Sequence, residues 1–490
     1  MIAPSKVKVE PGKLHINGQF IDAASGKTFD TINPATGEVL TRVAEGGAED
    51  VDRAVKAARA AFDAGPWSRK LSGADRGRLL WKIGDLLMAQ VEEIAELETL
   101  DSGKPITDTT RVDVPLAADC FYYYAGLAGK IHGETIPVRG PYFNYTLREP
   151  VGVCGQITPW NFPILMAAWK LAPALACGNT AVLKPASLTP LTALRLGALC
   201  QQAGVPDGVV NVVPGSGSVA GMALVRHPQV DKIALTGSTQ VGQQVMREAS
   251  ETLKKLSLEL GGKSPNIVFA DADLEAAARG AQMGIFYNMG EICTAGSRLF
   301  VEQQVHEALM EKLIERSKKT IPGDPLDPKC RFGPQVSEGQ MNTILKYIGK
   351  GKEEGATLAI GGNRARVGEG KGYFVEPTIF TGVSNSMTIA REEIFGPVLA
   401  VIPFKDLDDV IRQGNETIYG LAAGVWTKDI KKGHRVAREL RAGTVWINTY
   451  GNYDSGMPFG GFKMSGFGRE LGTAAVAEYT QLKSVWVDLS

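Results

Sequence analysis

The chain has 490 residues, of which 44% are hydrophobic and 22% charged, the composition of an ordinary globular protein. A chain of this length exceeds the size at which a single core stops growing, so we expect two or three lobes. Lys+Arg and Asp+Glu are both 53, and this balance argues against a nucleic-acid or membrane-surface partner.

The first residues and the cysteines bear on where the protein works. The start, MIAPSK, lacks the apolar run of a signal peptide, and no stretch reaches the roughly 18 apolar residues that a membrane span needs. The six cysteines and five histidines are scattered, without CxxC spacing or histidine pairing. We therefore expect a cytoplasmic protein with no membrane span, no disulfide framework and no metal site.

The first half of the chain predicts helices and then an α/β alternation. Residues 51–64 and 75–100 predict amphipathic helices, because apolar residues recur three and four positions apart. Short apolar strands then alternate with helices, which is typical of a parallel sheet with helices on its faces. The expected strands are 151–157, 180–183, 209–213 and 232–235, and the expected helices are 165–176, 191–203, 218–225 and 241–250.

A second α/β rhythm follows and predicts another lobe. Its expected elements are 266–269, 274–283, 305–318, 341–354, 398–403 and 444–448. The segment 361–372, rich in Gly and Arg, is expected to be an exposed loop. Segments 133–148 and 483–490 favour strands but fit neither lobe, so we expect them to pair with another subunit.

Two strand-to-helix junctions carry glycines where a phosphate could bind. The run GSGSVA (215–220) matches the dinucleotide fingerprint with Ala in the last position, although such turns often contain glycine for other reasons. In TGSTQVG (236–242), Ser238 and the free amides of the next helix could hold a pyrophosphate. Alternatively, Ser238 or Thr239 only caps that helix. Two such junctions in one βαβ array favour a dinucleotide.

Two polar residues lie close to expected strand ends. Lys184 could reach a ribose hydroxyl or a phosphate at the sheet edge where ligands bind, or it could be a solvated surface lysine. Asn161 lies between two aromatic residues and could donate a hydrogen bond to an oxyanion. Alternatively, Asn161 caps the following helix, with Pro163 in its first turn.

Cys293 and Glu259 form the most informative pair. Cys293 alone would more often be a small buried hydrophobe, but glycine and polar residues surround it instead of a long apolar run. Glu259 alone would be a surface carboxylate, but its apolar neighbours and the two following glycines favour partial burial, which would raise its pKa toward that of a useful base. A cysteine nucleophile and a carboxylate base can together form and hydrolyse a thioester.

Together these segments resemble the aldehyde dehydrogenase superfamily, in its hydrolytic, non-acylating and NAD(P)-dependent branch. The resemblance extends from NPATG (33–37) to the C-terminal strand. It implies an α/β fold with a Rossmann-like cofactor domain, an α/β catalytic domain and a small β element for bridging or oligomerisation. The implied boundaries are 1–127 and 149–260 for the NAD(P)-binding domain, 261–448 for the catalytic domain and 128–148 with 477–490 for the bridging element, while 449–476 returns to the cofactor domain.

The resemblance implies an enzyme that oxidises an aldehyde to the carboxylic acid through a thiohemiacetal and a thioester on cysteine. Cys293 matches the nucleophile, and Glu259 matches the general base that activates the hydrolytic water. Asn161, with the Cys293 backbone amide, matches the oxyanion hole. Lys170 and Glu470 match a pair that relays protons from the base.

The same resemblance implies contacts to NAD or NADP. Lys184 matches a lysine on the adenosine ribose, and Ser238 matches the pyrophosphate contact. Glu393 matches the carboxylate that holds the nicotinamide ribose, and Phe395 matches the ring beside the nicotinamide. The other implied cofactor contacts are Ile157, Thr158, Pro159, Trp160, Ala186, Ser187, Gly217, Gly237, Val241, Leu260 and Gly261.

The chain departs from the family pattern at two positions. Most relatives have Gln where Glu291 stands, and the extra carboxylate could raise the Cys293 pKa and slow its attack, or could accept a proton. Most NAD-specific relatives carry a Glu that repels a 2′-phosphate where this chain has Ser187. Because specificity often rests on such a repulsive group, we expect use of both NAD and NADP.

The family's substrate tunnel maps onto an aromatic and uncharged set, Phe162, Met166, Trp169, Tyr287, Ile292, Thr294, Tyr453 and Phe459. Succinic-semialdehyde relatives place Arg at the position of Trp169, so a short semialdehyde is not expected. The lining favours medium-chain aliphatic or arylalkyl aldehydes. Betaine aldehyde is the alternative through cation–π contact, although the family's betaine pocket has a further Trp where residues 450–453 read YGNY.

Three other functions compete with this interpretation, and each conflicts with a feature of the sequence. A CoA-acylating dehydrogenase would lack the base that Glu259 supplies, and a non-catalytic protein would have lost the nucleophile or the oxyanion donor. A cysteine hydrolase would need an activating histidine, of which only His306 is close, and would leave Lys184 and Glu393 unexplained. We expect a homo-oligomer, a tetramer rather than a dimer, that binds a small-molecule aldehyde and neither nucleic acid nor membrane.

Overall fold

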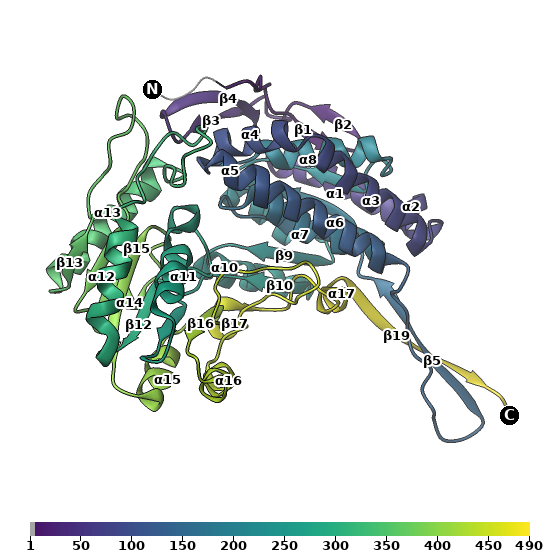
Figure 1. Ribbon diagram of the computed structural model, residues 1–490. Helices are drawn as coiled ribbons and strands as arrows, with labels where there is room; N and C mark the ends of the chain where they lie inside the picture. Colours follow the sequence, from purple (N-terminus) through teal and green to yellow (C-terminus); the bar gives the residue numbers. More distant parts are fainter. Residues whose placement is uncertain (1–4) are drawn as a thin grey trace.

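The computed structural model of the protein describes residues 5–490 and contains two α/β lobes, each built on a mostly parallel sheet (Figure 1). The first sheet has the order β18 (Gly466–Phe467), β10 (Lys255–Glu259), β9 (Lys232–Thr236), β6 (Val153–Ile157), β7 (Thr180–Lys184), β8 (Val210–Val212), β1 (Leu14–Ile16) and β2 (Gln19–Ile21). Strands β6 to β10 run parallel, and β1, β2 and β18 extend the sheet antiparallel at its two edges.

Helices cover both faces of this first sheet, and the longer ones bury apolar side chains against it. They are α1 (Ala48–Asp63), α2 (Pro66–Arg69), α3 (Gly73–Ala89), α4 (Val91–Ser102), α5 (Ile106–Asp108), η1 (Thr109–Asp113), α6 (Val114–Ala128), α7 (Pro163–Ala176), α8 (Leu191–Ala203), η2 (Gly217–Gly221), α9 (Met222–Arg226), α10 (Thr239–Ala249), η3 (Ser250–Thr252) and α17 (Ala474–Tyr479). Helix α7 is buried along its whole length, so it forms the centre of this lobe.

The second sheet has the order β13 (Thr357–Ile360), β14 (Thr378–Thr381), β15 (Val398–Phe404), β12 (Arg298–Glu302), β11 (Pro265–Val268), β16 (Ala422–Trp426) and β17 (Thr444–Ile447), and β13 is antiparallel to its neighbour. Its helices are α11 (Leu274–Phe286), η4 (Tyr287–Gly290), η5 (Gln303–Val305), α12 (His306–Ser317), α13 (Glu338–Glu353), α14 (Thr388–Arg391), α15 (Leu407–Asn415) and α16 (Ile430–Glu439). A short turn, η6 (Lys463–Ser465), precedes β18. Each face of this sheet buries a separate apolar cluster.

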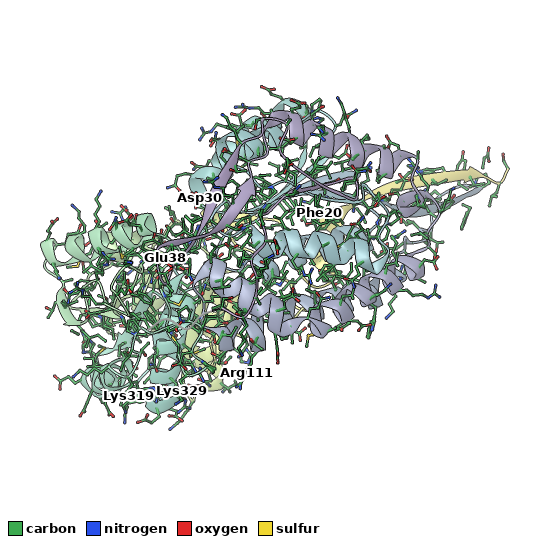
Figure 2. All side chains as sticks on the ribbon, turned by 90° about the horizontal axis from the view of Figure 1, so that it is seen from above. Phe20, Asp30, Glu38, Arg111, Lys319 and Lys329 are labelled. Atoms are coloured by element: carbon green, nitrogen blue, oxygen red, sulfur yellow. The ribbon has the colours of Figure 1, made fainter. Side chains whose placement is uncertain are left out.

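Two antiparallel ribbons lie outside these sheets. Strands β5 (Tyr142–Pro150) and β19 (Thr480–Asp488) pair along their full length and project away from the body, with the C-terminus at the tip (Figure 1). Strands β3 (Thr28–Asn33) and β4 (Glu38–Ala44) form the second ribbon, marked by Asp30 and Glu38 in Figure 2. The turn of this ribbon contacts the second lobe, since the Tyr373 amide donates to the Pro34 carbonyl.

Most expected elements form, with three corrections. The single helix expected over 75–100 is wrong, because Gln90 leaves the helical region (φ −118°, ψ 21°) and separates α3 from α4. The helix expected over 218–225 begins as a π-helical turn and becomes α-helical at Met222. Helix α6 was not predicted, because buried apolar residues lie around much of its circumference and leave no clear stripe. The prediction on the first four residues lies outside the described part of the chain.

Candidate active site

A cavity of about 870 Å³ lies between the lobes and receives side chains from both lobes and from the segments on either side of β18. The predicted residues that line it are Pro159, Trp160, Asn161, Phe162, Met166, Trp169, Gly237, Ser238, Glu259, Leu260, Gly261, Tyr287, Ile292, Cys293, Thr294, Glu393, Phe395, Tyr453, Phe459 and Glu470. The predicted residues outside its lining are Ile157, Thr158, Lys170, Lys184, Ala186, Ser187, Gly217 and Val241. The predicted catalytic and substrate residues therefore meet, apart from Lys170, around one space.

The loop that carries Cys293 has an unusual backbone. Asn288, Met289 and Gly290 all have left-handed φ values, between 46° and 77°. Glycine is needed at the third position, because a Cβ on Gly290 would come within 2.2 Å of the Gly396 carbonyl oxygen. This conformation turns the chain sharply after α11, and Cys293 is the one partly exposed cysteine of the six, since the other five are buried.

Cys293 is a thiol that its surroundings hold in the neutral form. Burial raises its pKa, and the nearby carboxylates of Glu393 and Glu259 raise it further. The backbone amides of Cys293 and Thr294 act in the opposite direction, because they favour the thiolate. The same amides are the donors that an oxyanion on a group attached to this sulfur would meet.

Glu259 ends β10, where its backbone is held between β9 and β18. Its side chain is buried, and neither carboxyl oxygen has a hydrogen-bond partner. Burial, followed by the charge of Glu470, raises its pKa well above the ordinary value. The alternative of a surface carboxylate is wrong, and an unpartnered buried carboxyl beside a cavity is suited to proton transfer.

Behind Glu259, Lys170 of α7 forms a buried ion pair with Glu470. The Lys170 ammonium also donates to the Thr236 hydroxyl at 2.7 Å, and the second Glu470 oxygen has no partner. Glu470 reaches the cavity lining while Lys170 stays behind it. A chain of ionisable groups thus runs from the cavity into the body of the first lobe.

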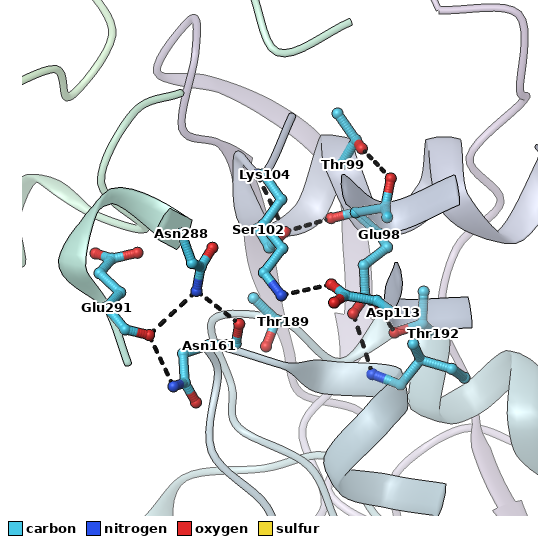
Figure 3. A network of polar contacts seen from close by, with 12 residues as sticks. Glu98, Thr99, Ser102, Lys104, Asp113, Asn161, Thr189, Thr192, Asn288 and Glu291 are labelled. Atoms are coloured by element: carbon cyan, nitrogen blue, oxygen red, sulfur yellow. Dashed lines mark hydrogen bonds and ion pairs between the residues drawn. The ribbon is translucent and has the colours of Figure 1, made fainter. Parts of the chain in front are cut away.

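Asn161 precedes α7, and its side chain points to the cysteine loop (Figure 3). Its Nδ2 donates to the Glu291 backbone oxygen at 2.8 Å, and Asn288 Nδ2 donates to both the Asn161 and Glu291 backbone oxygens at 3.1 Å. The alternative that Asn161 caps α7 is wrong, because Phe162 is the N-cap residue and the Glu98 carboxylate, not Asn161, accepts from the Ile164 amide at the start of that helix. Pro163 does occupy the first turn, as expected.

A second polar cluster lies at the other end of the first sheet's carboxyl edge. The buried Lys184 ammonium donates to the carbonyls of Pro185 and Gly215 at 2.7 and 3.0 Å, and the Ser187 hydroxyl donates to the same Gly215 carbonyl at 2.9 Å. Burial lowers the pKa of Lys184 to about 8, so the alternative of a solvated surface lysine is wrong. A Cβ on Gly217 would meet no atom within 4 Å, which leaves open space beside this cluster.

The groups along this edge match the chemistry of a dinucleotide. Ser238 caps α10 by accepting from the Val241 amide at 3.3 Å, and the start of the helix faces the cavity with its remaining amides. Glu393 accepts from the Gly262 amide at 2.9 Å, and burial raises its pKa to about 7. A cationic group, a helix N-terminus and a carboxylate thus follow one another from the open space at Gly217 to Cys293.

The far end of the cavity is aromatic. Trp169, Tyr453 and Phe459 contact one another with ring centroids 5.3 to 6.3 Å apart. The Tyr453 hydroxyl lies 2.5 Å from the Thr294 hydroxyl, beside the cysteine. Opposite these rings, Phe162 and Tyr287 lie 6.5 Å apart. No charged side chain belongs to this wall, so it can hold a substrate mainly through apolar contact.

Comparison with known proteins assigns the chain. The model of the aldehyde dehydrogenase family matches residues 20–485. The chain belongs to the aldehyde dehydrogenase family. It is 52% identical over 477 residues to the putative aldehyde dehydrogenase DhaS of Bacillus subtilis, covering 97% of this chain and 96% of that one.

Solved aldehyde dehydrogenases share the fold closely. The NAD+ complex of the Bacillus cereus aldehyde dehydrogenase superposes with a TM-score of 0.97 at 50% identity over 100% of both chains. The indole-3-acetaldehyde dehydrogenase AldA of P. syringae, in complex with NAD+ and IAA, has a TM-score of 0.97 at 48% identity over 99% of this chain and 98% of that chain. The protein is therefore an oxidoreductase that oxidises aldehydes, and the expected Rossmann-like α/β fold is confirmed.

In this aldehyde dehydrogenase, Glu291 is not among the groups that raise the pKa of Cys293. Its carboxyl group accepts a hydrogen bond from the Val336 amide at 3.1 Å, and Figure 3 shows it pointing away from Asn161. The acidic groups that raise the pKa of Cys293 are Glu393 and Glu259. Glu291 is instead buried in the wall behind the loop.

Several residues of the aldehyde dehydrogenase cavity were not predicted. Val112 and Leu116, at the end of η1 and in α6, line it, as do Met283, Tyr450 and Asn452. The packing of α6 and α11 brings Leu116 and Met283 to the cavity, and the loop after β17 brings Tyr450 and Asn452. Among residues 5–490, no group of metal-ligating side chains is arranged to hold a metal ion, and no helix is long and apolar enough to cross a membrane.

Proposed function

We propose that the enzyme oxidises medium-chain aliphatic or arylalkyl aldehydes to carboxylic acids with NAD+, through a thioester on Cys293. The observation that carries this proposal is the uncharged aromatic wall of Trp169, Tyr453 and Phe459 next to the partly exposed cysteine. Such a wall holds an alkyl or aryl group by contact area and gives no partner to a distal carboxylate. The name of the P. syringae relative refers to an arylalkyl aldehyde of this kind.

The chemistry uses the residues in the positions described. The Cys293 thiolate adds to the aldehyde carbon, and the resulting oxyanion accepts from the Asn161 side chain and the Cys293 amide. NAD+, when bound, would supply the acceptor for the hydride that leaves this carbon. Glu259 then takes a proton from water, whose oxygen attacks the thioester and releases the carboxylic acid and the thiolate. Lys170 and Glu470 pass the proton from Glu259 toward the interior of the first lobe.

The cofactor assignment rests on the polar edge of the first sheet, which forms the NAD(P)-binding domain in this proposal. Lys184 would hold the adenosine ribose, the start of α10 at Gly237 and Ser238 would hold the pyrophosphate, and Glu393 would hold the nicotinamide ribose. NAD+ complexes of two relatives support the choice of cofactor. Ser187 carries no charge to repel a 2′-phosphate, so NADP is accepted as well.

Betaine aldehyde is the second candidate substrate. The rings of Trp169, Tyr453 and Phe459 form one aromatic surface against which a quaternary ammonium group could lie. The aliphatic and arylalkyl proposal is preferred, because the cavity also extends between apolar side chains of α6 and α11 that a small cation would not reach.

The test is reduced-nicotinamide absorbance with phenylacetaldehyde, hexanal, betaine aldehyde and succinic semialdehyde, each with NAD and NADP, beside Cys293→Ala. Turnover of hexanal and phenylacetaldehyde that is lost in the variant supports the proposal. Preference for betaine aldehyde favours the second candidate. Preference for succinic semialdehyde, or turnover that survives in Cys293→Ala, contradicts both.

The assembly and the location of the enzyme are part of the same proposal. The β5–β19 ribbon exposes apolar side chains, among them Leu147, Leu482 and Trp486, and within the described chain the outer edge of β19 has no partner strand. Exposed strand edges of this kind recruit further strands. We therefore assign the ribbon to the interface of a homotetramer. We also propose that the enzyme works in the cytoplasm.

A further inference from the structure

The loop between α11 and Cys293 is held in place at one residue, Glu291. Glu291 is 2% exposed, and its carboxyl group accepts a hydrogen bond from the Val336 amide. Its backbone oxygen accepts two more, from the side-chain amides of Asn161 and Asn288. Glu291 therefore joins the cysteine loop to the segment before α13 on one side and to the proposed oxyanion donor on the other.

The anchor on the far side is rigid. Val336 is buried, and the neighbouring Gln335 amide donates to the Tyr373 carbonyl at 2.8 Å. Ser337 then caps α13 by accepting from the Gln340 amide. The Glu291 carboxyl group, hydrogen-bonded to the Val336 amide, is thus attached to a segment whose backbone is itself held by hydrogen bonds.

We propose that Glu291 is a positioning residue: its carboxyl group anchors the cysteine loop to Val336, and its backbone oxygen thereby keeps the Asn161 side chain aimed at the oxyanion. The Asn161 amide has two hydrogens, and the Glu291 carbonyl takes one. The other is left to point into the cavity that Asn161 lines. A loop that shifted would turn this hydrogen away from the developing charge.

The anchor works as a neutral acid. Burial raises the pKa of Glu291 well above its usual value, and the Val336 amide and the ammonium of Lys104 offset this only in part. Lys104 is itself engaged by Asp113 in a buried ion pair (Figure 3). A protonated carboxyl has the shape and the acceptor oxygen of a glutamine amide. Glu291→Gln is therefore the conservative variant that keeps the anchor, and Glu291→Ala removes it.

The inference rests on the proposed function, since it concerns the same oxyanion. With hexanal and NAD we expect Glu291→Gln to keep kcat within about twofold and Glu291→Ala to lose about tenfold or more, with KM for NAD little changed. In the Asn161→Ala background, Glu291→Ala should cost less than about threefold, because the group it positions is already absent. Equal losses in the two Glu291 variants, or additive losses in the double variant, would overturn the inference.

A second measurement does not depend on turnover and separates this inference from the proposed function. Because the folded state raises the pKa of Glu291, its contribution to stability is present at low pH and is lost as pH rises through the folded value. The melting temperature of the wild type should therefore fall, relative to that of Glu291→Gln, as pH rises. A constant difference between the two proteins would contradict a neutral anchor. Failure of all aldehydes to react, with this shift present, would contradict only the proposed function.

Discussion

At the scale of single residues, the site combines a thiol and a carboxyl whose neutral forms are favoured by burial. Glu393 and Glu259 add to the effect of burial on Cys293, whereas Glu470 raises the pKa of Glu259 and the charges of Lys170 and Arg469 offset this only in part. Catalysis therefore requires that both lose a proton in the working complex. Ionising either group in a water-poor cavity costs free energy. Once ionised, the thiolate is therefore a stronger nucleophile and the carboxylate a stronger base.

Glu259→Gln should separate the two halves of the reaction. The amide cannot take a proton from water, so we expect one rapid turnover of NADH per site and then a steady-state rate lower by about 10²-fold or more. Stopped-flow absorbance measures both phases. A loss of the first turnover in parallel with the second would contradict the assignment of Glu259 to thioester hydrolysis.

The raised pKa of Glu259 also predicts the pH dependence of the wild type. The base acts in its ionised form, so steady-state kcat should rise with pH through the folded pKa of Glu259. Stability should change in the opposite sense, because the neutral form is the one that folding favours. The measurement is the pH profile of kcat, with the size of the first turnover as the internal control.

Ser187 should decide between the two cofactors. Its hydroxyl lies beside Lys184 at Gly215, where a carboxylate would face the 2′ position of the adenosine ribose in the proposed complex. We expect Ser187→Glu to lower kcat/KM for NADP about tenfold or more while that for NAD stays within a few-fold. Glutamine has nearly the size of glutamate but no charge, so Ser187→Gln is the control. An equal loss of kcat/KM for NADP in that variant would mean that steric hindrance, and not charge, is responsible.

At the scale of elements, the turn after α11 shows how a local backbone conformation places a nucleophile. Asn288, Met289 and Gly290 form η4 with left-handed φ values, which costs energy at the methionine. The side-chain amide of Asn288 recovers part of this cost through its two hydrogen bonds. The conformation is needed because it brings Cys293 from the end of a buried helix to the cavity.

Gly290→Ala tests this turn, and Gly451→Ala is its matched control. Both glycines have a φ of 77°, so an alanine carries a similar backbone penalty at each position. A Cβ at Gly290 also meets the Gly396 carbonyl oxygen at 2.2 Å, whereas at Gly451 it meets nothing within 4 Å. We expect Gly290→Ala to lower the melting temperature clearly more than Gly451→Ala and to reduce kcat. Equal effects would show that the close approach at Gly396 relaxes without cost.

At the scale of the whole molecule, the active site is an interface within one chain. The first lobe supplies Asn161 and Glu259, the second supplies Cys293 and Glu393, and Glu470 comes from the segment that returns to the first sheet. Strand β18 makes this return by pairing antiparallel with β10, next to Glu259. The order of segments along the chain is thus different from their order around the cavity.

The substitution Trp486→Asp should dissociate the proposed tetramer. Trp486 is 59% exposed on β19, and a charge there would have to be buried if the ribbon joins another subunit. Light scattering should show a smaller assembly for this variant. Val39→Asp is the control, because Val39 is 54% exposed on β4, which is outside the β5–β19 ribbon. An unchanged mass for Trp486→Asp would contradict the interface.

Much of the fold and of the candidate site could be predicted from local patterns. The strand and helix alternation predicts both sheets, because a 2-residue or a 3.6-residue period depends only on neighbours along the chain. The break at Gln90 was missed because no glycine or proline marks it, and helix α6 was missed, since a helix that is buried on several sides loses its apolar stripe. Val112 and Leu116 could not be assigned to the cavity for the same reason.

The sequence by itself determined the family and supplied the proposed residues of the chemistry, because the motifs around Glu259 and Cys293 are continuous in the chain. Only the tertiary structure decided which groups act on one another. Lys170 and Glu470 are 300 positions apart and form one buried pair, and Glu291 binds Val336 and not the cysteine beside it. The physical reason is that the pKa values and hydrogen bonds of buried groups are set by neighbours in space, which the order of residues alone does not contain.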